Sequence, residues 1–255
     1  MAQRLEIFAV PGIPLVVPGD DLISLIETGL KSINQSLQNQ DIVVIAQKIV
    51  SKSEGRIVEL SSVEPSPKAL ELAKQSEKDP RLVELILSES KEIIRYRPGL
   101  IITAHKLGYI LANAGIDVSN VAPENDGEQV LLLPVNPDQS CTVLRSQIRA
   151  YYNKDVAVII NDSVGRAWRV GTVGIALGAD GLESVLDLRG KEDLFGRPLA
   201  VSIVGIGDEM AAAASILQGQ GNEGLPVVII RGFVGEKTVM RGSDLVRDKE
   251  EDLFR

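Results

Sequence analysis

The pattern of apolar and polar positions divides the chain into short strands and amphipathic helices. Residues 42–46 (IVVIA) and 156–160 (VAVII) are continuous apolar runs bounded by polar residues, which is typical of strands buried on both faces. The second run leads into Asn161, Asp162 and Ser163, and loops at strand ends commonly deliver ligand groups. Further strands are predicted over residues 5–10, 99–105, 109–115, 199–206 and 226–233, and one follows an acidic loop within residues 122–134.

Helices are predicted where apolar residues recur at helical spacing behind a capping side chain. Asp20 or Asp21 caps a helix that reaches residue 33. Ser66 and Asp79 each stand before a proline, which marks two more helix starts. The helix after Asp79 is expected to continue until Arg95 and Arg97 leave it.

Two helices are predicted in the second half of the chain. One covers residues 136–152 and is expected to be capped near Asp138 or Ser140. Asp208 or Glu209 is expected to open the other, which is rich in alanine. Glycines at positions 171, 174, 178 and 181 indicate tight turns or close backbone approach, without a dinucleotide or Walker motif.

Composition limits the class of protein. The chain has 255 residues, of which 44% are hydrophobic and 24% charged, so it can bury a core as one large or two small domains. Its net charge of −8 argues against a nucleic-acid or anionic-membrane surface. No window approaches about 18 uninterrupted apolar residues, so no membrane span is expected. We find no signal-peptide pattern and no linker between autonomous domains.

The single cysteine, Cys141, excludes an intrachain disulfide and fits a reducing compartment. Together with the absent span, this predicts a cytoplasmic protein. His105 is the only histidine, and we interpret it as a loop residue rather than a ligand.

Three polar loops close to apolar strands carry the candidate chemistry: residues 117–120, Asp162-Ser163 and residues 218–223. Two isolated carboxylates with neutral oxygens suit Mg²⁺ or Mn²⁺ rather than zinc, and such cations commonly accompany nucleotide phosphates. Arg166 and Arg169 can hold phosphate. Each loop is equally a good turn sequence, so both readings stay open at this point.

The proline-rich segment over residues 11–21 (PGIPLVVPGDD) is stiff and irregular. It is either a connector or a preformed backbone wall against a flat ligand such as a base.

Six motifs occur in one order along the chain: PGIPLVVPGDDL, VVIAQKIVSKSEGR, ESKEIIRYRPG, ANAGIDVSNV, DSVGRAWRVG and GQGNEGLPVVIIRG. Together they resemble the coenzyme F420-0:L-glutamate ligase family, over about residues 5–233. The resemblance implies a mixed-sheet, two-lobed α+β fold that is not Rossmann. It also implies one ligase unit over residues 1–245, a charged tail over 246–255 and an intertwined homodimer.

The resemblance also implies site residues. The nucleotide and cofactor positions would be Gly12, Ile13, Pro14, Leu15, Gln47, Lys48, Lys52, Asn120, Gln218, Gly219, Gln220, Gly221, Asn222, Glu223, Gly224 and Leu225. The metal ligands would be Asp117, Asp162, Ser163 and Gln220. Lys48, Lys52 and Asp162 would act in catalysis.

The implied reaction joins L-glutamate to the terminal carboxylate of F420-0, a deazaflavin precursor, through an amide, with γ-linked glutamate addition. GTP would phosphorylate that carboxylate, and glutamate would attack the acyl phosphate. Mg²⁺ or Mn²⁺, and possibly K⁺, are the expected ions. The expected partners are F420-0, L-glutamate and GTP, with neither nucleic acid nor membrane.

The chain departs from the family pattern at Ser163, where threonine is more common, at Val164 and at Ala167. Gly174 stands where Asp or Asn is expected. Two alternatives follow: a GTP-dependent ligase for another carboxylate, or a guanine-nucleotide-binding regulatory module without turnover.

Overall fold

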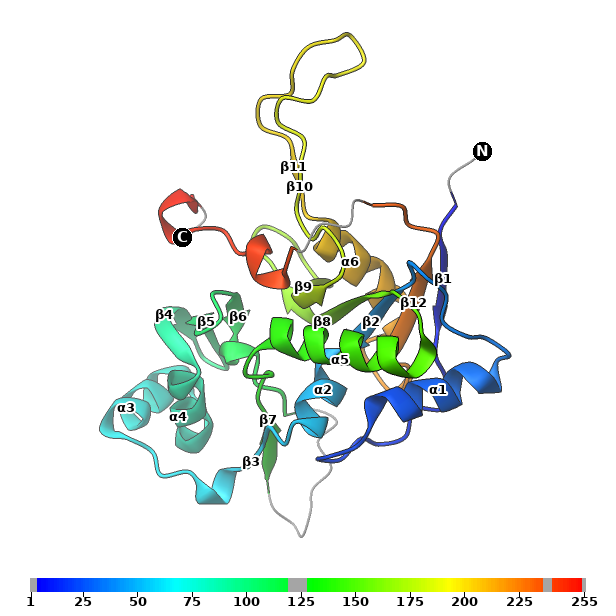
Figure 1. The fold of residues 1–255 in the computed structure, drawn as a ribbon. Coiled ribbons are helices and arrows are strands. Elements are labelled where there is room, and N and C mark those ends of the chain that lie inside the picture. The colour runs from blue at the N-terminus through cyan, green and yellow to red at the C-terminus, as the bar shows by residue number, and fades with distance from the viewer. Residues whose placement is uncertain (1–3, 119–127, 236–239, 254–255) are drawn as a thin grey trace.

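A five-stranded mixed sheet in the order β1-β12-β2-β8-β9 forms the larger part of the fold (Figure 1). The computed structural model describes residues 4–118, 128–235 and 240–253. The strands are β1 (Glu6–Ala9), β2 (Ile42–Ala46), β8 (Ala157–Gly165), β9 (Thr172–Asp180) and β12 (Val227–Arg231). β2 and β8 are parallel and the other neighbours are antiparallel, so the fold is α+β with a mixed sheet, as expected.

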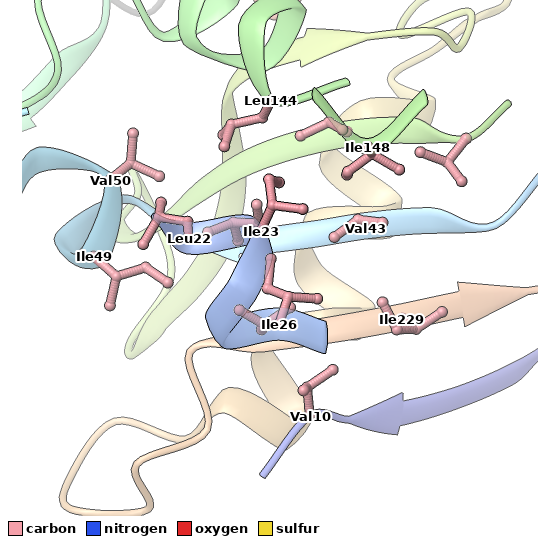
Figure 2. Close-up of a cluster of buried hydrophobic side chains, with 14 of the residues drawn as sticks. Val10, Leu22, Ile23, Ile26, Val43, Ile49, Val50, Leu144, Ile148 and Ile229 are labelled. Atoms are coloured by element: carbon pink, nitrogen blue, oxygen red, sulfur yellow. The ribbon is translucent and has the colours of Figure 1, made fainter. Parts of the chain in front are cut away.

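Helices cover both faces of this sheet. The first face packs against α1 (Leu22–Ser32), α2 (Gln47–Ser53) and α5 (Pro137–Tyr152), whose side chains meet Val43 and Ile229 in one apolar cluster (Figure 2). The opposite face packs against α6 (Ile206–Gln218) through Val44 and Ile230. Successive strand residues point to opposite faces, so burial on both sides explains the continuous apolar runs.

A smaller unit lies to one side of the main sheet (Figure 1). It holds α3 (Pro67–Ser76), α4 (Pro80–Ser88) and the antiparallel sheet β4 (Ser90–Arg97), β5 (Leu100–His105) and β6 (Ile110–Ala112) around its own apolar cluster. The pair β3 (Ile57–Glu59) and β7 (Gln129–Leu131) lies beside it. A cluster of Tyr109, Leu111, Leu133 and Leu177 joins the unit to β9.

An arm formed by residues 183–204 projects from the body (Figure 1). β10 (Leu186–Asp187) and β11 (Ile203–Val204) pair at its base, and an isolated antiparallel bridge joins Glu192 to Pro198 farther out. Leu194, Phe195 and Val201 farther out are 100%, 82% and 84% exposed. Short 3-10 segments complete the fold: η1 (Leu60–Ser62), η2 (Asn113–Gly115), η3 (Gly242–Leu245) and η4 (Lys249–Glu251).

Several predicted boundaries are confirmed. Asp21, Ser66 and Asp79 accept hydrogen bonds from the first turns of α1, α3 and α4. β5 and β6 form the predicted hairpin. Among the described helices, none combines the length and the apolar character needed to cross a membrane.

Other boundaries were predicted wrongly. Residues 199–206 are not one strand, because most of them form the exposed return of the arm, and α6 already begins at Ile206 behind Gly205. The cap of α5 is Asn136, whose side chain accepts from Gln139 N.

The polar residues after β2 and α4 also differ from expectation. Residues 47–53 form the helix α2, which is too short for its period to be read from the sequence. The helix after Asp79 ends at Ser88, and Arg95 and Arg97 belong to β4.

Candidate functional site

A cavity of about 520 Å³ opens at the sheet edge where β1 and β2 end and β12 begins. Three contacts gather the segments there: Val10 N donates to Val227 O, Ala46 N donates to Pro226 O, and Ala46 pairs with Asn161. Each connecting loop must therefore pass this edge. Loops that are far apart in the sequence converge on one cavity.

Most of the predicted site residues line this cavity. They are Ile13, Pro14, Leu15, Gln47, Lys48, Lys52, Asp117, Asp162, Ser163, Gln218, Gly219, Gln220, Gly221, Asn222, Gly224 and Leu225. Gly12 and Glu223 are not part of the lining, and Asn120 lies outside the described residues. A larger cavity of about 590 Å³ between α1, α2 and α5 contains none of the predicted residues.

Helix α2 brings two lysines to the cavity. Lys48 Nζ lies 2.5 Å from Asp117 Oδ2, so the helix is joined to the chain that follows β6. Lys52 is buried, and burial together with the positive charge of Lys48 lowers its pKa. Gln47 is also buried, and its Oε1 accepts from Ser51 Oγ at 2.9 Å. A short, packed helix therefore places two lysine side chains in the lining of the cavity.

Asp162 lies within β8 rather than in a loop after it. The register of β8 against β9 shifts between Ile160 and Asn161, a bulge that changes which side chains face the cavity. Burial raises the pKa of Asp162 to about 7 and the Asp117 carboxylate adds to the rise, whereas the Ser163 N–H and Lys48 oppose it. Two carboxylates thus lie close enough to influence each other, which favours a bound cation.

The two uncharged candidate metal ligands, Ser163 and Gln220, contact each other. Gln220 Nε2 donates to Ser163 Oγ at 2.6 Å, so the glycine-rich loop reaches across to β8. Among the residues that the structure describes, no group of three or more His, Cys, Asp and Glu side chains could hold a metal. Two carboxylates, one hydroxyl and one amide are a hard oxygen set, and they fit Mg²⁺ or Mn²⁺ better than zinc.

Asn161 is a site residue that the sequence analysis missed. It is 2% exposed, and its Nδ2 donates to Gln218 Oε1 at 2.7 Å while Gln218 Nε2 donates back to its Oδ1 at 3.1 Å. The pair fixes the end of α6 against β8. Its only signal in the sequence is a polar residue directly after the apolar run.

Glu223 shapes the glycine-rich loop from outside the cavity. Its carboxylate accepts from Gly221 N at 2.8 Å and lies over Gly219, where an added Cβ would meet it at 2.1 Å. Gly219 also has a φ of +71°, which favours glycine. Glu223 therefore supports the loop backbone.

Gly174 has a packing explanation. A Cβ at this position would lie 2.5 Å from Ala211 O, because β9 runs directly against α6. Gly178 is in similar contact with Pro137 O at 2.5 Å, so the predicted close approach of these glycines is confirmed. The departure at position 174 therefore has an explanation in the packing of β9 against α6.

The loop over residues 166–171 joins β8 to β9 and does not line the cavity. Arg166 Nη1 donates to Gly171 O at 3.0 Å, and Trp168 is 87% exposed.

His105 is not the loop residue that was expected. It ends β5, is buried, and its Nδ1 accepts from Leu107 N. Its Nε2 lies 3.8 Å from Glu89 Oε2.

Comparison with known proteins gives consistent matches. The sequence model of the F420-0:gamma-glutamyl ligase family matches residues 12–232. The coenzyme F420:L-glutamate ligase of Methanothermobacter thermautotrophicus is 43% identical over 253 residues, covering 98% of this chain and 99% of the relative. The enzyme of the same name from Archaeoglobus fulgidus is 39% identical over 255 residues, covering 99% and 97%.

Proposed function

Because the chain belongs to the F420-0:gamma-glutamyl ligase family, we propose that it forms an amide between L-glutamate and the terminal carboxylate of F420-0 at the expense of GTP. It is an amide-forming ligase by its full-length similarity to ligases. The observation that carries the finer proposal is the convergence of Asp117, Asp162, Ser163 and Gln220 with two lysines on one cavity.

The nucleotide lies between the loop at Gly12–Leu15 and the glycine-rich loop that ends at Leu225. Lys48 and Lys52 face it from α2, and their fixed charge attracts the phosphates. The exposed Leu15 and the backbone around it offer a wall for the base.

Asp117, Asp162, Ser163 and Gln220 are the residues that would hold Mg²⁺ or Mn²⁺, with K⁺ as a further candidate. A bound divalent ion would neutralise charge on the phosphoryl oxygens. In this structure Lys48 forms an ion pair with Asp117, one of these four residues.

The reaction proceeds in two steps. A carboxylate oxygen of F420-0 bonds to the γ-phosphorus of GTP and the bond to the bridging oxygen breaks, which releases GDP and leaves an acyl phosphate. The glutamate amine then bonds to the acyl carbon, loses a proton, and displaces phosphate. Lys48 and Lys52 stabilise negative charge during the transfer.

The test is a ligation assay with the purified chain, GTP, Mn²⁺ or Mg²⁺, L-glutamate and F420-0, read by mass spectrometry. We expect a product with the mass of one added glutamate. The rate at which this product forms should fall by about 100-fold or more in Asp162→Ala. Glu71→Ala on the exposed face of α3 is the carboxylate control and should keep wild-type turnover. Metal-dependent GTP binding without product would indicate another acceptor, and absence of GTP binding would overturn the proposal.

We further propose that the chain works as a homodimer and that the arm over residues 183–204 contributes to the contact. Leu194 and Phe195 expose apolar area that a monomer leaves in water. Light scattering should give a dimer mass for the wild type and a smaller mass for a Leu194→Asp, Phe195→Asp double variant. An unchanged mass would remove the arm from the interface.

A further inference from the structure

The loop over residues 166–171 carries an unusual combination of side chains, and it follows Ser163, which lines the cavity, on the same segment. From it we infer that this loop binds the acceptor, with Trp168 stacked on the flat deazaflavin ring and Arg166 and Arg169 facing its anionic chain. The inference rests on the proposed function and names the part of the same site that would recognise F420-0.

The order of strands separates the two substrates. The proposed nucleotide segments follow β1 and β2 and precede β12, and these three strands lie on one side of β8 in the sheet. The loop with Trp168 leaves β8 on the other side, toward β9. Asp162 and Ser163 lie between them, where a carboxylate from one side and a phosphate from the other can meet. The proposed nucleotide segments and the loop with Trp168 therefore lie on opposite sides of β8 in the strand order.

Trp168 is close enough to Ser163 for one acceptor molecule to contact both. Trp168 lies five residues beyond Ser163 on the same segment, so their Cα atoms are at most about 18 Å apart. An extended acceptor whose ring lies on Trp168 can point its chain along β8 toward Asp162 and Ser163.

Trp168 combines an exposed side chain with an unfavourable backbone conformation. It is the only tryptophan of the chain, it is 87% exposed, and its φ of +65° lies in the left-handed region, which residues with a side chain rarely adopt. The ring contacts among the described side chains involve Tyr151 with Tyr152 and arginines over Phe8 and Phe195, and none includes Trp168. A large ring presented in this way favours an aromatic ligand.

The loop is also a local concentration of positive charge. The whole chain carries −8, yet Arg166 and Arg169 flank Trp168 within four residues. Arg166 closes the loop through Gly171 O, and within the described part of the chain we find no ion pair of Arg169. Guanidinium groups bind carboxylates and phosphates through paired donors, so the loop suits an aromatic anion.

The first measurement is tryptophan fluorescence, because Trp168 is the sole emitter of its kind. Titration of the wild-type chain with F420-0 should quench the emission in a saturable way, after correction against free N-acetyltryptophanamide. GTP alone should leave the emission unchanged. Unsaturable quenching equal to that of the free amide would overturn the inference, whether or not the chain ligates glutamate.

The second measurement is steady-state kinetics. Trp168→Ala should raise KM for F420-0 about tenfold and leave KM for GTP within about twofold, whereas Trp168→Phe keeps a ring and should stay within about threefold. Arg169→Gln should raise KM for F420-0, and Arg149→Gln, exposed on α5, serves as its control. Unchanged F420-0 kinetics in Trp168→Ala, with wild-type ligation intact, would overturn the inference and leave the proposed function standing.

A contact with a second copy of the chain is the competing explanation for the exposed ring. In that case the wild-type emission would shift on dilution without ligand, and Trp168→Ala would change the oligomeric mass. Either result would assign Trp168 to an interface and overturn its role in acceptor binding.

Discussion

The side-chain amides of Asn161 and Gln218 exchange two hydrogen bonds, at 2.7 and 3.1 Å, between β8 and the last residue of α6. Asn161 Nδ2 also donates to Ala211 O at 3.3 Å. The glycine-rich loop starts directly after Gln218, so this pair sets where the loop leaves the sheet edge. The same two side chains thus stabilise the contact between β8 and α6 and shape the candidate site.

Asn161→Ala should lower the free energy of unfolding by about 1–3 kcal/mol, because it removes both hydrogen bonds between the buried Asn161 and the half-buried Gln218 side chain. The midpoint of urea unfolding measures this. Asn222→Ala, exposed in the glycine-rich loop, is the matched control and should stay within about 0.5 kcal/mol. Equal midpoints for Asn161→Ala and wild type would show that the pair contributes nothing.

Lys48→Met should weaken GTP binding by about 10–100-fold, since it removes a charged donor that faces the proposed phosphate site and leaves Asp117 without its 2.5 Å partner. Isothermal titration with GTP and Mn²⁺ measures the affinity. Lys68→Met on α3 is exposed and should bind GTP as the wild type does. Unaltered GTP affinity in Lys48→Met would remove Lys48 from the nucleotide site.

Gly174→Ala should destabilise the fold by about 1–3 kcal/mol, because its Cβ would lie 2.5 Å from the Ala211 carbonyl oxygen. Gly165→Ala is the control, since nothing lies within 4 Å of a Cβ there and its φ is not in the left-handed region. Thermal unfolding of both variants separates the effect of packing from the loss of a glycine. Equal melting temperatures would show that β9 and α6 can move apart without cost.

Local features were predictable from the sequence, and features that depend on strand order were not. The runs over residues 42–46 and 156–160 became β2 and β8 because burial on both faces selects continuous apolar residues. The caps at Ser66 and Asp79 were predictable because each is a contact within a few residues. From the residues alone the site was predicted only as separate polar loops, and the resemblance to a known family grouped them into one site.

The missing information was long-range. Nothing local shows that β12 inserts between β1 and β2, which is what brings residues 218–225 beside the loop at residues 12–15. Helix α2 escaped prediction because seven residues are about two turns, and its Ile49 and Val50 continue the preceding apolar run. The arm was misread as a strand because exposed Val201 and Ile203 carry the same apolar signal as core residues.

Acid should weaken the fold through Glu89, which lies between the smaller unit and the main body. The His105 imidazole beside Glu89 lowers the pKa of this carboxyl most, and the charges of Arg56 and Lys106 add to that, against the opposing effect of burial. Arg56 Nη2 contacts Glu89 Oε2 at 2.9 Å, and Arg56 Nε also donates to Leu133 O. A carboxyl whose folded pKa is below its unfolded value of 4.5 stabilises the fold above that pH. This contribution is lost as pH falls from 4.5 through the folded pKa.

Glu89→Gln should therefore lower the free energy of unfolding by about 1–3 kcal/mol at pH 7 and by progressively less as pH falls below 4.5. Urea unfolding of both proteins across the acid range measures the difference, and Glu71→Gln, exposed on α3, should show none at any pH. If the wild type stays more stable than Glu89→Gln by the same free energy of unfolding down to the lowest pH, the loss in the variant comes from the shape of the glutamine side chain. An advantage that shrinks with acid would assign the loss to the charge of Glu89, and with it part of the acid sensitivity of the contact between the two units.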